Sequence, residues 1–245
     1  MELISWGTSE QVVELIELKT QFDEGSTLNS LSPHRSKLDG FLLENEEWGM
    51  APPFCVLVLL GSFGLLQAQS TVVLTASFPL EDGQELKEFT ITNSAGLKTT
   101  VLNYGATLTG MHTPDRRGDF ANVTLYLEDP NAYLSGHPLL GSVVGRFANR
   151  IDTGGFSIDG TRYDLESFNP KTKVHIHGGK TGFQKQFWDS EIVENGVRFR
   201  LTSDDGHEGF PGKLEASVTY RLTNKNELVM TYEATTDRPT HVNLT

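Results

Sequence analysis

Alternating apolar and polar residues, in short runs separated by turn residues, fill the chain from about residue 85 onward. A period of two is typical of strands that bury one face. In the clearest example, "EFTITN" and "KTTVLNYG" flank the turn "SAG" and predict a hairpin, with Gly105 at a bend or bulge. Further strands are expected at "ATLTGMHT" and "NVTLYL", and "DPNAYLSG" is irregular enough to hold a short helix.

Three more hairpins are predicted toward the end of the sequence. The first turns at Asp159-Gly160, the second at Asn195-Gly196 and the third between Asn224 and Asn226. A last alternating run, "MTYEATTDRPTHVNLT", reads as a strand up to Thr245. Because no helix-period segment of useful length interrupts these runs, we expect an all-β fold, either a large antiparallel β-sandwich or a barrel.

The first 49 residues have a different character. They hold ten acidic and three basic residues, so they carry most of the net charge of −12. Val12, Leu15 and Ile16 approach helical spacing. We therefore expect residues 1–49 to be an acidic extension that is partly disordered or forms one helix ending near Gly25.

One strongly apolar run, residues 54–67, follows this extension. It is shorter than the roughly 20 residues that cross a bilayer, and "AQS" after it supplies the small residues of a cleavage site, so residues 50–70 resemble a secretion signal. If Met50 is the true start, we expect a secreted or periplasmic protein with no membrane attachment after removal of the signal. The alternative is a hydrophobic segment inside a genuine N-terminal extension of a cytoplasmic protein.

Composition narrows the classes of protein and of site. The only cysteine, Cys55, excludes an intrachain disulfide framework and a cysteine-rich zinc site. The acidic net charge disfavours nonspecific binding to nucleic acid. The domain that follows the apolar run, residues 71–245, must therefore be stabilised by packing.

Two histidines two residues apart, His175 and His177, are the first candidates for chemistry. In an extended strand they would share one face, and Gly178 and Gly179 would let a ligand approach closely. Three interpretations stay open: ligands of a metal, groups that transfer protons, or hydrogen-bonded residues of a sheet. Because a catalytic zinc site needs a third protein ligand, which no spacing predicts, we expect no metal.

Polar residues in two other stretches could bind a ligand. "GRFANRI" places Arg146 and Arg150 around Asn149, and guanidinium and amide groups suit sugar hydroxyls and carboxylates. The alternative is that these residues cap a turn or form surface ion pairs. "DDGHEGFPG" is typical of a Gly-Pro loop in which His207 and Glu208 are merely solvated.

Together, the order and spacing of these stretches resemble the aldose 1-epimerase (galactose mutarotase) family. The matching segments are "NYGATLTGMHTPDRRGDFANVTLYLEDPNAY", "GRFANRIDTGGFSIDGTRYDL", "HGGKTGFQKQFW", "SDDGHEGFPGKLEASVTYRLTNKNELVMTYEATTD" and "VNLT". They span about residues 85–245 in the correct order, which is more specific than any single motif. The sequence departs from the family pattern by two extra residues between "NRI" and "HGG", in the loop "NPKTKV".

The resemblance implies a galactose mutarotase-like β-sandwich whose concave face binds a free sugar. It also implies an isomerase that interconverts the α and β anomers of aldoses such as glucose or galactose without a cofactor. In that reaction a glutamate removes the proton of the C1 hydroxyl while a histidine protonates the ring oxygen. By motif match, His177 is the family's first active-site histidine, which hydrogen-bonds the sugar near its ring. Asn149 and Arg150 are matched to substrate-orienting groups, and His175 has no such role.

The resemblance also implies parts of the site that this sequence does not contain. In the family, "NLT" continues to the histidine acid, and the glutamate base lies later still, whereas the chain ends at Thr245. We therefore expect an incomplete sandwich over residues 71–245, lacking its C-terminal part, and a chain that is inactive or weakly active. The alternative to an enzyme is a non-catalytic carbohydrate-binding β-sandwich, and in either case the partner is a small aldose sugar.

Overall fold

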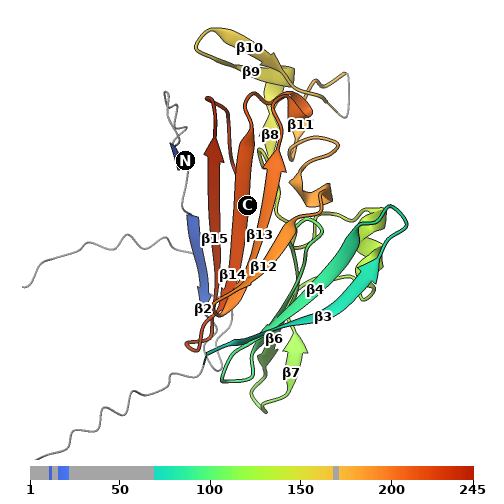
Figure 1. The fold of residues 1–245 in the computed structure, drawn as a ribbon, viewed down its shortest axis with the longest axis vertical. Helices are drawn as coiled ribbons and strands as arrows, with labels where there is room; N and C mark the ends of the chain where they lie inside the picture. Colours follow the sequence, from blue (N-terminus) through green and yellow to red (C-terminus); the bar gives the residue numbers. More distant parts are fainter. Residues whose placement is uncertain (1–10, 13–15, 22–68, 168–170) are drawn as a thin grey trace, which may run out of the picture. The chain divides into compact units, whose positions relative to one another are not determined.

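The computed structural model describes residues 11–12, 16–21, 69–167 and 171–245 (Figure 1). These residues form strands and short 3-10 helices, so the all-β fold expected from the alternating pattern is confirmed. In this part of the chain no helix is long and apolar enough to span a membrane. The apolar run 54–67 and the expected helix end near Gly25 lie outside the described residues.

One antiparallel sheet follows the chain order, β3-β4-β5-β6-β7 (Figure 1). Its strands are β3 Thr71–Pro79, β4 Glu85–Thr92, β5 Lys98–Leu102, β6 Thr107–Pro114 and β7 Phe120–Asn122. The predicted hairpin at "SAG" joins β4 to β5. Gly96 in this turn has a φ of 85°, a left-handed conformation that glycine adopts without steric cost.

The strand expected at "NVTLYL" is mostly absent from this sheet, because β7 ends at Asn122. The side-chain oxygen of Asn122 accepts hydrogen bonds from the backbone N–H groups of Met111 and Thr124. The Val123 N–H still donates to the Met111 carbonyl, but the acceptor for the Met111 N–H is a side chain and not a main-chain carbonyl. Such local bonds compete with strand continuation. Beyond this point Leu125 and Tyr126 are exposed.

The second antiparallel sheet has the order β1-β15-β14-β13-β12, with β2 also paired to β15. Its strands are β1 Gln11–Val12, β2 Ile16–Gln21, β12 Asp189–Val193, β13 Gly196–Ser203, β14 Leu214–Leu222 and β15 Glu227–Thr236. The predicted hairpins β12–β13 and β14–β15 are confirmed. The first turns one residue earlier than predicted, because Val193 pairs with Gly196 and leaves Glu194 and Asn195 in the turn.

The described residues of the N-terminal extension are strands, so the expected helix is wrong there. Strand β2 pairs antiparallel with β15, from Ile16 opposite Tyr232 to Gln21 opposite Glu227. The order Ile16-Glu17-Leu18-Lys19 also alternates apolar and charged residue types. The edge of β15 offers unpaired backbone groups to this segment, whereas a short isolated helix is only marginally stable. Pairing with β15 therefore prevails over the near-helical spacing.

The core lies between the two sheets. Phe89 of β4 meets Phe199 of β13 edge to face, with ring centroids 6.0 Å apart. The buried hydroxyl of Tyr220 on β14 donates to the carbonyl of Ala106 across 2.7 Å. Burying each such large side chain contributes about 2 kcal/mol. The two sheets therefore share one hydrophobic core, as expected of a β-sandwich.

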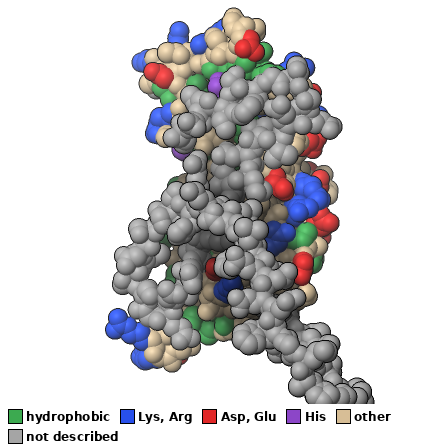
Figure 2. All heavy atoms as spheres, turned by 90° about the vertical axis from the view of Figure 1, so that its left-hand side faces the viewer, with side chains coloured by type: hydrophobic (Ala, Val, Ile, Leu, Met, Phe, Trp, Pro, Cys, Tyr) green, Lys and Arg blue, Asp and Glu red, His purple; other side chains and the backbone are tan. Residues whose placement is uncertain are grey.

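Small elements form parts of the connections between the strands of the two sheets. They are the 3-10 helices η1 Pro130–Ser135, η2 Asp152–Gly154, η3 Phe183–Lys185 and η4 His207–Gly209, and the strand pairs β8 Arg150–Ile151 with β11 His175–Ile176 and β9 Gly155–Ile158 with β10 Thr161–Asp164. The predicted short helix and the Asp159-Gly160 hairpin are both confirmed. Figure 2 shows acidic and basic side chains interspersed around the end of the molecule that carries β9 and β10.

The last run of the sequence is a strand only up to Thr236. The following segment instead returns to the stretch before β8: Asn243 forms a parallel bridge with Phe147 and donates its backbone N–H to the Arg146 carbonyl. Pro239 interrupts the alternating pattern and has no N–H to donate to a ladder. This return fixes the backbone immediately before Asn149.

Candidate functional site

Asn149 and His177 are joined by two reciprocal hydrogen bonds. The backbone N–H of His177 donates to the Asn149 carbonyl over 2.8 Å, and the backbone N–H of Asn149 donates to Nδ1 of His177 over 3.0 Å. The pairing of β8 with β11 sets up this contact, because it places Ile176 opposite Arg150. The structure thus brings together the three residues matched to the sugar site, Asn149, Arg150 and His177.

The hydrogen bond to Nδ1 determines the form of the His177 ring. A nitrogen that accepts an N–H cannot carry the proton of the neutral imidazole, so the proton is on Nε2. Burial and the nearby positive charge of Arg150 both lower the pKa of His177. Near neutral pH, His177 is therefore a neutral ring that offers an Nε2–H donor.

Arg150 and Asn149 lie beside this ring with exposed side chains. The Nη1 of Arg150 donates to Oδ1 of Asn149 across 3.1 Å, which holds the guanidinium next to the amide. Asn149 has a φ of 68°, a left-handed conformation that asparagine tolerates better than most residues. The cluster presents guanidinium, amide and imidazole groups to solvent, a set suited to hydroxyl groups.

The two glycines after His177 do not open space for a ligand, contrary to the expectation from the sequence. Both are buried. A Cβ on Gly178 would overlap the carbonyl oxygen of Gly145, and a Cβ on Gly179 would overlap the carboxylate of Glu208. Glycine is therefore needed at these two positions because other parts of the protein pack against them, and not because a ligand does.

His175 and His177 do not share one face. The strand β11 ends at Ile176, and His177 has a φ of 51°, outside the extended region. His175 is fully buried, and its Nδ1 lies 2.7 Å from the Glu166 carbonyl oxygen. Of the interpretations left open for His175, the hydrogen-bonded sheet residue is the correct one.

Arg146 is neither a turn cap nor part of a surface ion pair. Its side chain is 2% exposed, and its donors reach Ser203 Oγ at 2.8 Å and the carbonyls of Ser203, Asp204 and Pro211 at 2.7, 2.6 and 3.0 Å. Burial lowers the pKa of Arg146 to about 10, against the opposing effect of nearby aspartates. Arg146 therefore anchors the loop 203–211 and does not contact the surface cluster.

His207 and Glu208 of that loop are not merely solvated. Nδ1 of His207 lies 2.7 Å from Ser203 Oγ, and Nε2 lies 3.1 Å from Thr181 Oγ1. Oε1 of Glu208 accepts hydrogen bonds from the backbone N–H and the hydroxyl of Thr181. These contacts join two loops that are distant in sequence, and local sequence patterns contain no signal for them.

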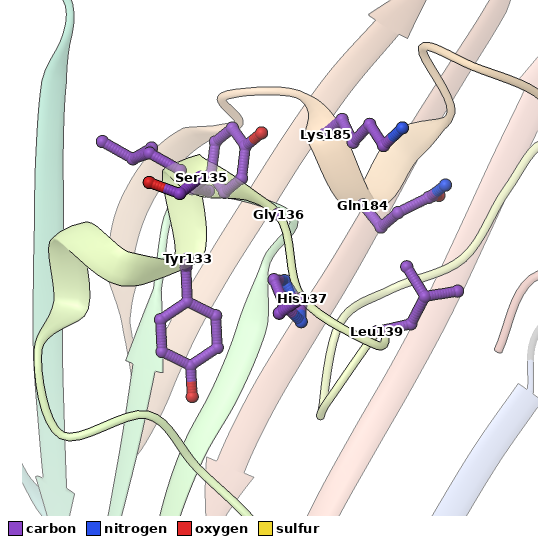
Figure 3. A pocket seen from close by; sticks show the side chains of 9 residues that line it. Tyr133, Ser135, Gly136, His137, Leu139, Gln184 and Lys185 are labelled. Carbon is purple, nitrogen blue, oxygen red and sulfur yellow. The ribbon is translucent and has the colours of Figure 1, made fainter.

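A cavity of about 260 Å³ lies near the cluster but does not include it (Figure 3). Tyr104, Tyr133, His137, Gln184 and Lys185 contribute to its lining. Gln184, a buried residue for which the sequence predicts no role, connects the two regions, because its Nε2 donates to the His177 carbonyl over 3.1 Å. Its amide points away from His137 in Figure 3, and none of the cluster residues Asn149, Arg150 and His177 lines the cavity.

Metal ligation finds no geometric support among the described side chains. No group of three or more histidine, cysteine, aspartate or glutamate residues in that part of the chain is close enough to hold an ion. His137 lines the cavity and His207 lies against Thr181, so neither joins His177.

Comparison with known proteins agrees with the pattern of motifs. The family model described as aldose 1-epimerase matches residues 87–245. A galactose mutarotase from Sus scrofa is 41% identical over 149 residues, covering 61% of this chain and 43% of its own length. An aldose 1-epimerase from Escherichia coli K12 is 40% identical over 168 residues, covering 67% of this chain and 47% of its own length.

Solved structures agree with the fold. The crystal structure of a galactose 1-epimerase from Lactobacillus acidophilus matches with a TM-score of 0.61 and 31% identity, covering 72% of this chain and 51% of that one. The crystal structure of an aldose epimerase homologue from C. elegans has a TM-score of 0.60 at 29% identity, covering 69% of this chain and 49% of that one. The chain thus spans about half the length of the relatives that it matches.

Proposed function

Because the chain belongs to the aldose 1-epimerase family, we propose that the protein interconverts the α and β anomers of free aldoses such as galactose or glucose by acid–base catalysed ring opening. The names of the relatives, galactose mutarotase and aldose 1-epimerase, support this isomerase activity. They also make the non-catalytic carbohydrate-binding module the less favoured alternative.

The observation that carries the proposal is the position of His177 beside Arg150. His177 offers an Nε2–H donor to an oxygen at or near the sugar ring, and Arg150 and Asn149 offer groups that bind hydroxyls. Because burial and the charge of Arg150 disfavour the imidazolium form, His177 orients and polarises the sugar and is a poor reservoir for the transferred proton. This division of roles fits the resemblance, which assigns the acid to a second histidine that follows "NLT".

Polarimetry and ligand-observed NMR test the proposal together. We expect galactose or glucose to bind with a dissociation constant on the order of 1 mM. We expect the protein to accelerate the mutarotation of freshly dissolved α-D-galactose, since an acid–base pair typically supplies about 10²- to 10⁴-fold in rate. Binding without any acceleration would favour the non-catalytic carbohydrate-binding alternative, and the absence of both would refute the proposal.

Matched variants locate the binding. We expect Arg150→Met and His177→Ala to weaken sugar binding about tenfold or more, since each removes hydrogen bonds to the ligand. Arg117→Met is the control, because Arg117 is exposed and contacts Asp115 and Asp119 within its own turn. Equal binding by all three variants would contradict the assignment of the site.

We further propose that the segment 50–70 holds an export signal with its cleavage site, and that the folded domain begins just after the cut. Gln69 and Ser70 support a cut before Gln69: Ser70 is buried, its N–H donates to Asn195 Oδ1 over 2.8 Å, and Gln69 Nε2 donates to Glu194. Such a cut also removes β1 and β2 from the edge of β15. N-terminal sequencing of the mature protein should find Gln69 first, in a secreted or periplasmic protein. A protein that retains Met1 would refute export.

A further inference from the structure

Glu208 contacts the turn that follows His177, although it belongs to another loop. Its carboxylate accepts from the Thr181 backbone N–H and hydroxyl and packs against Gly179 so closely that no Cβ fits there. Burial raises the pKa of Glu208, but the bonds from Thr181 and from the Lys180 backbone outweigh it and the pKa is lowered. Glu208 is therefore an ionised carboxylate held within this turn.

The turn that Glu208 contacts has an unusual backbone. His177, Gly178 and Gly179 have φ values of 51°, 76° and 89°, three left-handed residues in succession. His177 is the costly member, since a residue with a Cβ pays about 1 kcal/mol for this conformation. Such a backbone persists only where surrounding contacts determine it.

Those contacts come from three other segments of the chain. Asn149 exchanges two hydrogen bonds with His177. Gln184 donates to the His177 carbonyl, and Glu208 accepts from Thr181. Glu208 is itself in a left-handed conformation, with a φ of 53°, in a loop that the buried Arg146 anchors.

We propose that Glu208 is a positioning residue for His177. By holding Gly179 and Thr181, its carboxylate keeps the His177 turn left-handed, so that Nδ1 stays an acceptor for Asn149 and Nε2–H stays the donor. The inference deepens the proposed function. It rests on that function only for the identity of the group that accepts the Nε2–H hydrogen bond, a sugar oxygen. The position of the ring can be measured without any sugar.

NMR on the full 245-residue chain tests the inference with Glu208→Ala and Glu208→Gln. In Glu208→Ala we expect the His177 pKa to rise toward the ordinary value of roughly 6.5 and the ring to lose its preference for the Nε2–H tautomer. We expect amide hydrogen exchange at Asn149 to speed up about tenfold or more, because its acceptor is the His177 ring. Glu208→Gln keeps one acceptor oxygen, so its effects should be intermediate.

Glu215→Gln is the matched control, because Glu215 on β14 contacts Lys213 and Thr202 and does not touch the turn. We expect it to leave His177 and Asn149 unchanged. If Glu208→Ala does not fold, Glu208→Gln and Thr181→Val, which removes only the hydroxyl donor, take its place. A lower melting temperature with unchanged His177 titration and Asn149 exchange would overturn the inference and leave Glu208 a purely structural residue.

Sugar binding separates this inference from the proposed function. If the wild-type chain binds no aldose but Glu208→Ala still alters His177, the positioning role stands and the proposed function fails. If Glu208→Ala loses sugar binding while the His177 titration and the Asn149 exchange stay as in the wild type, Glu208 acts by another route and the positioning role is refuted.

Discussion

Asn149 donates its backbone N–H to Nδ1 of His177 over 3.0 Å and accepts the backbone N–H of His177 over 2.8 Å. The orientation of the imidazole is thus set by main-chain groups of two loops. The site accordingly depends on residues outside the cluster of Asn149, Arg150 and His177, above all the glycines and the buried arginine that hold these loops. Their contributions can be measured separately.

Gly178→Ala should destabilise the protein far more than Gly160→Ala. Both glycines have left-handed φ values, 76° and 79°, so the conformational cost of alanine, about 1 kcal/mol, is similar. Only at Gly178 does the new Cβ also overlap a carbonyl, that of Gly145, whereas nothing lies within 4 Å at Gly160. We expect a loss of about 3 kcal/mol or more in the free energy of unfolding for Gly178→Ala, by urea denaturation. Equal losses would mean that the Gly145 contact relaxes without cost.

Arg146→Met should be among the most damaging substitutions of a charged residue. It removes the buried guanidinium that holds the loop 203–211, and so leaves the carbonyls of Ser203, Asp204 and Pro211 without their donor. Since each unsatisfied buried group costs about 1–3 kcal/mol, we expect a loss of about 3 kcal/mol or more by chemical denaturation. Arg117→Met, at an exposed turn, should change the free energy of unfolding by less than about 0.5 kcal/mol. Similar values for the two variants would contradict the anchoring role.

Stability should fall as the pH drops below neutral. Burial lowers the pKa of four histidines: His137, His177, His207 and His241. In the unfolded chain they take up protons near the ordinary value of roughly 6.5, whereas in the folded protein they do so only at lower pH. The folded state therefore loses stability as the pH falls from about 7 through 6.5 toward the lowered pKa values.

Urea unfolding at about pH 7.5 and about pH 5.5 measures this effect. His137→Asn should reduce the difference between the two values, because it removes one of the contributing histidines. A free energy of unfolding that is equal or higher at the lower pH would show that these rings are not held in the neutral form.

Local sequence patterns predict the sheets well because the hairpins are local structures. Alternation identifies the strands, and a turn such as Asp159-Gly160 shows where the chain reverses and consecutive strands pair, since both turn residues have positive φ values. The pattern fails where a distant partner decides the outcome. The edge of β15 makes residues 16–21 a strand, and the side chain of Asn122 ends β7 early.

The candidate site is likewise only partly predictable from the sequence. Motif order identifies Asn149, Arg150 and His177, and the fold brings them together. Sequence reasoning wrongly assigns the space beside the glycines to a ligand, and it treats Glu208 as solvated. Both errors arise because the contacts concerned join loops that no local spacing relates.

The most direct test of the account follows the imidazole nitrogens of His177 by NMR during a titration with galactose at neutral pH. We predict a free ring protonated on Nε2, whose Nε2 resonance shifts as sugar binds while that of the buried His175 stays unchanged. Binding of galactose that leaves the His177 resonances unmoved would contradict the claim that the sugar lies against His177 and Arg150.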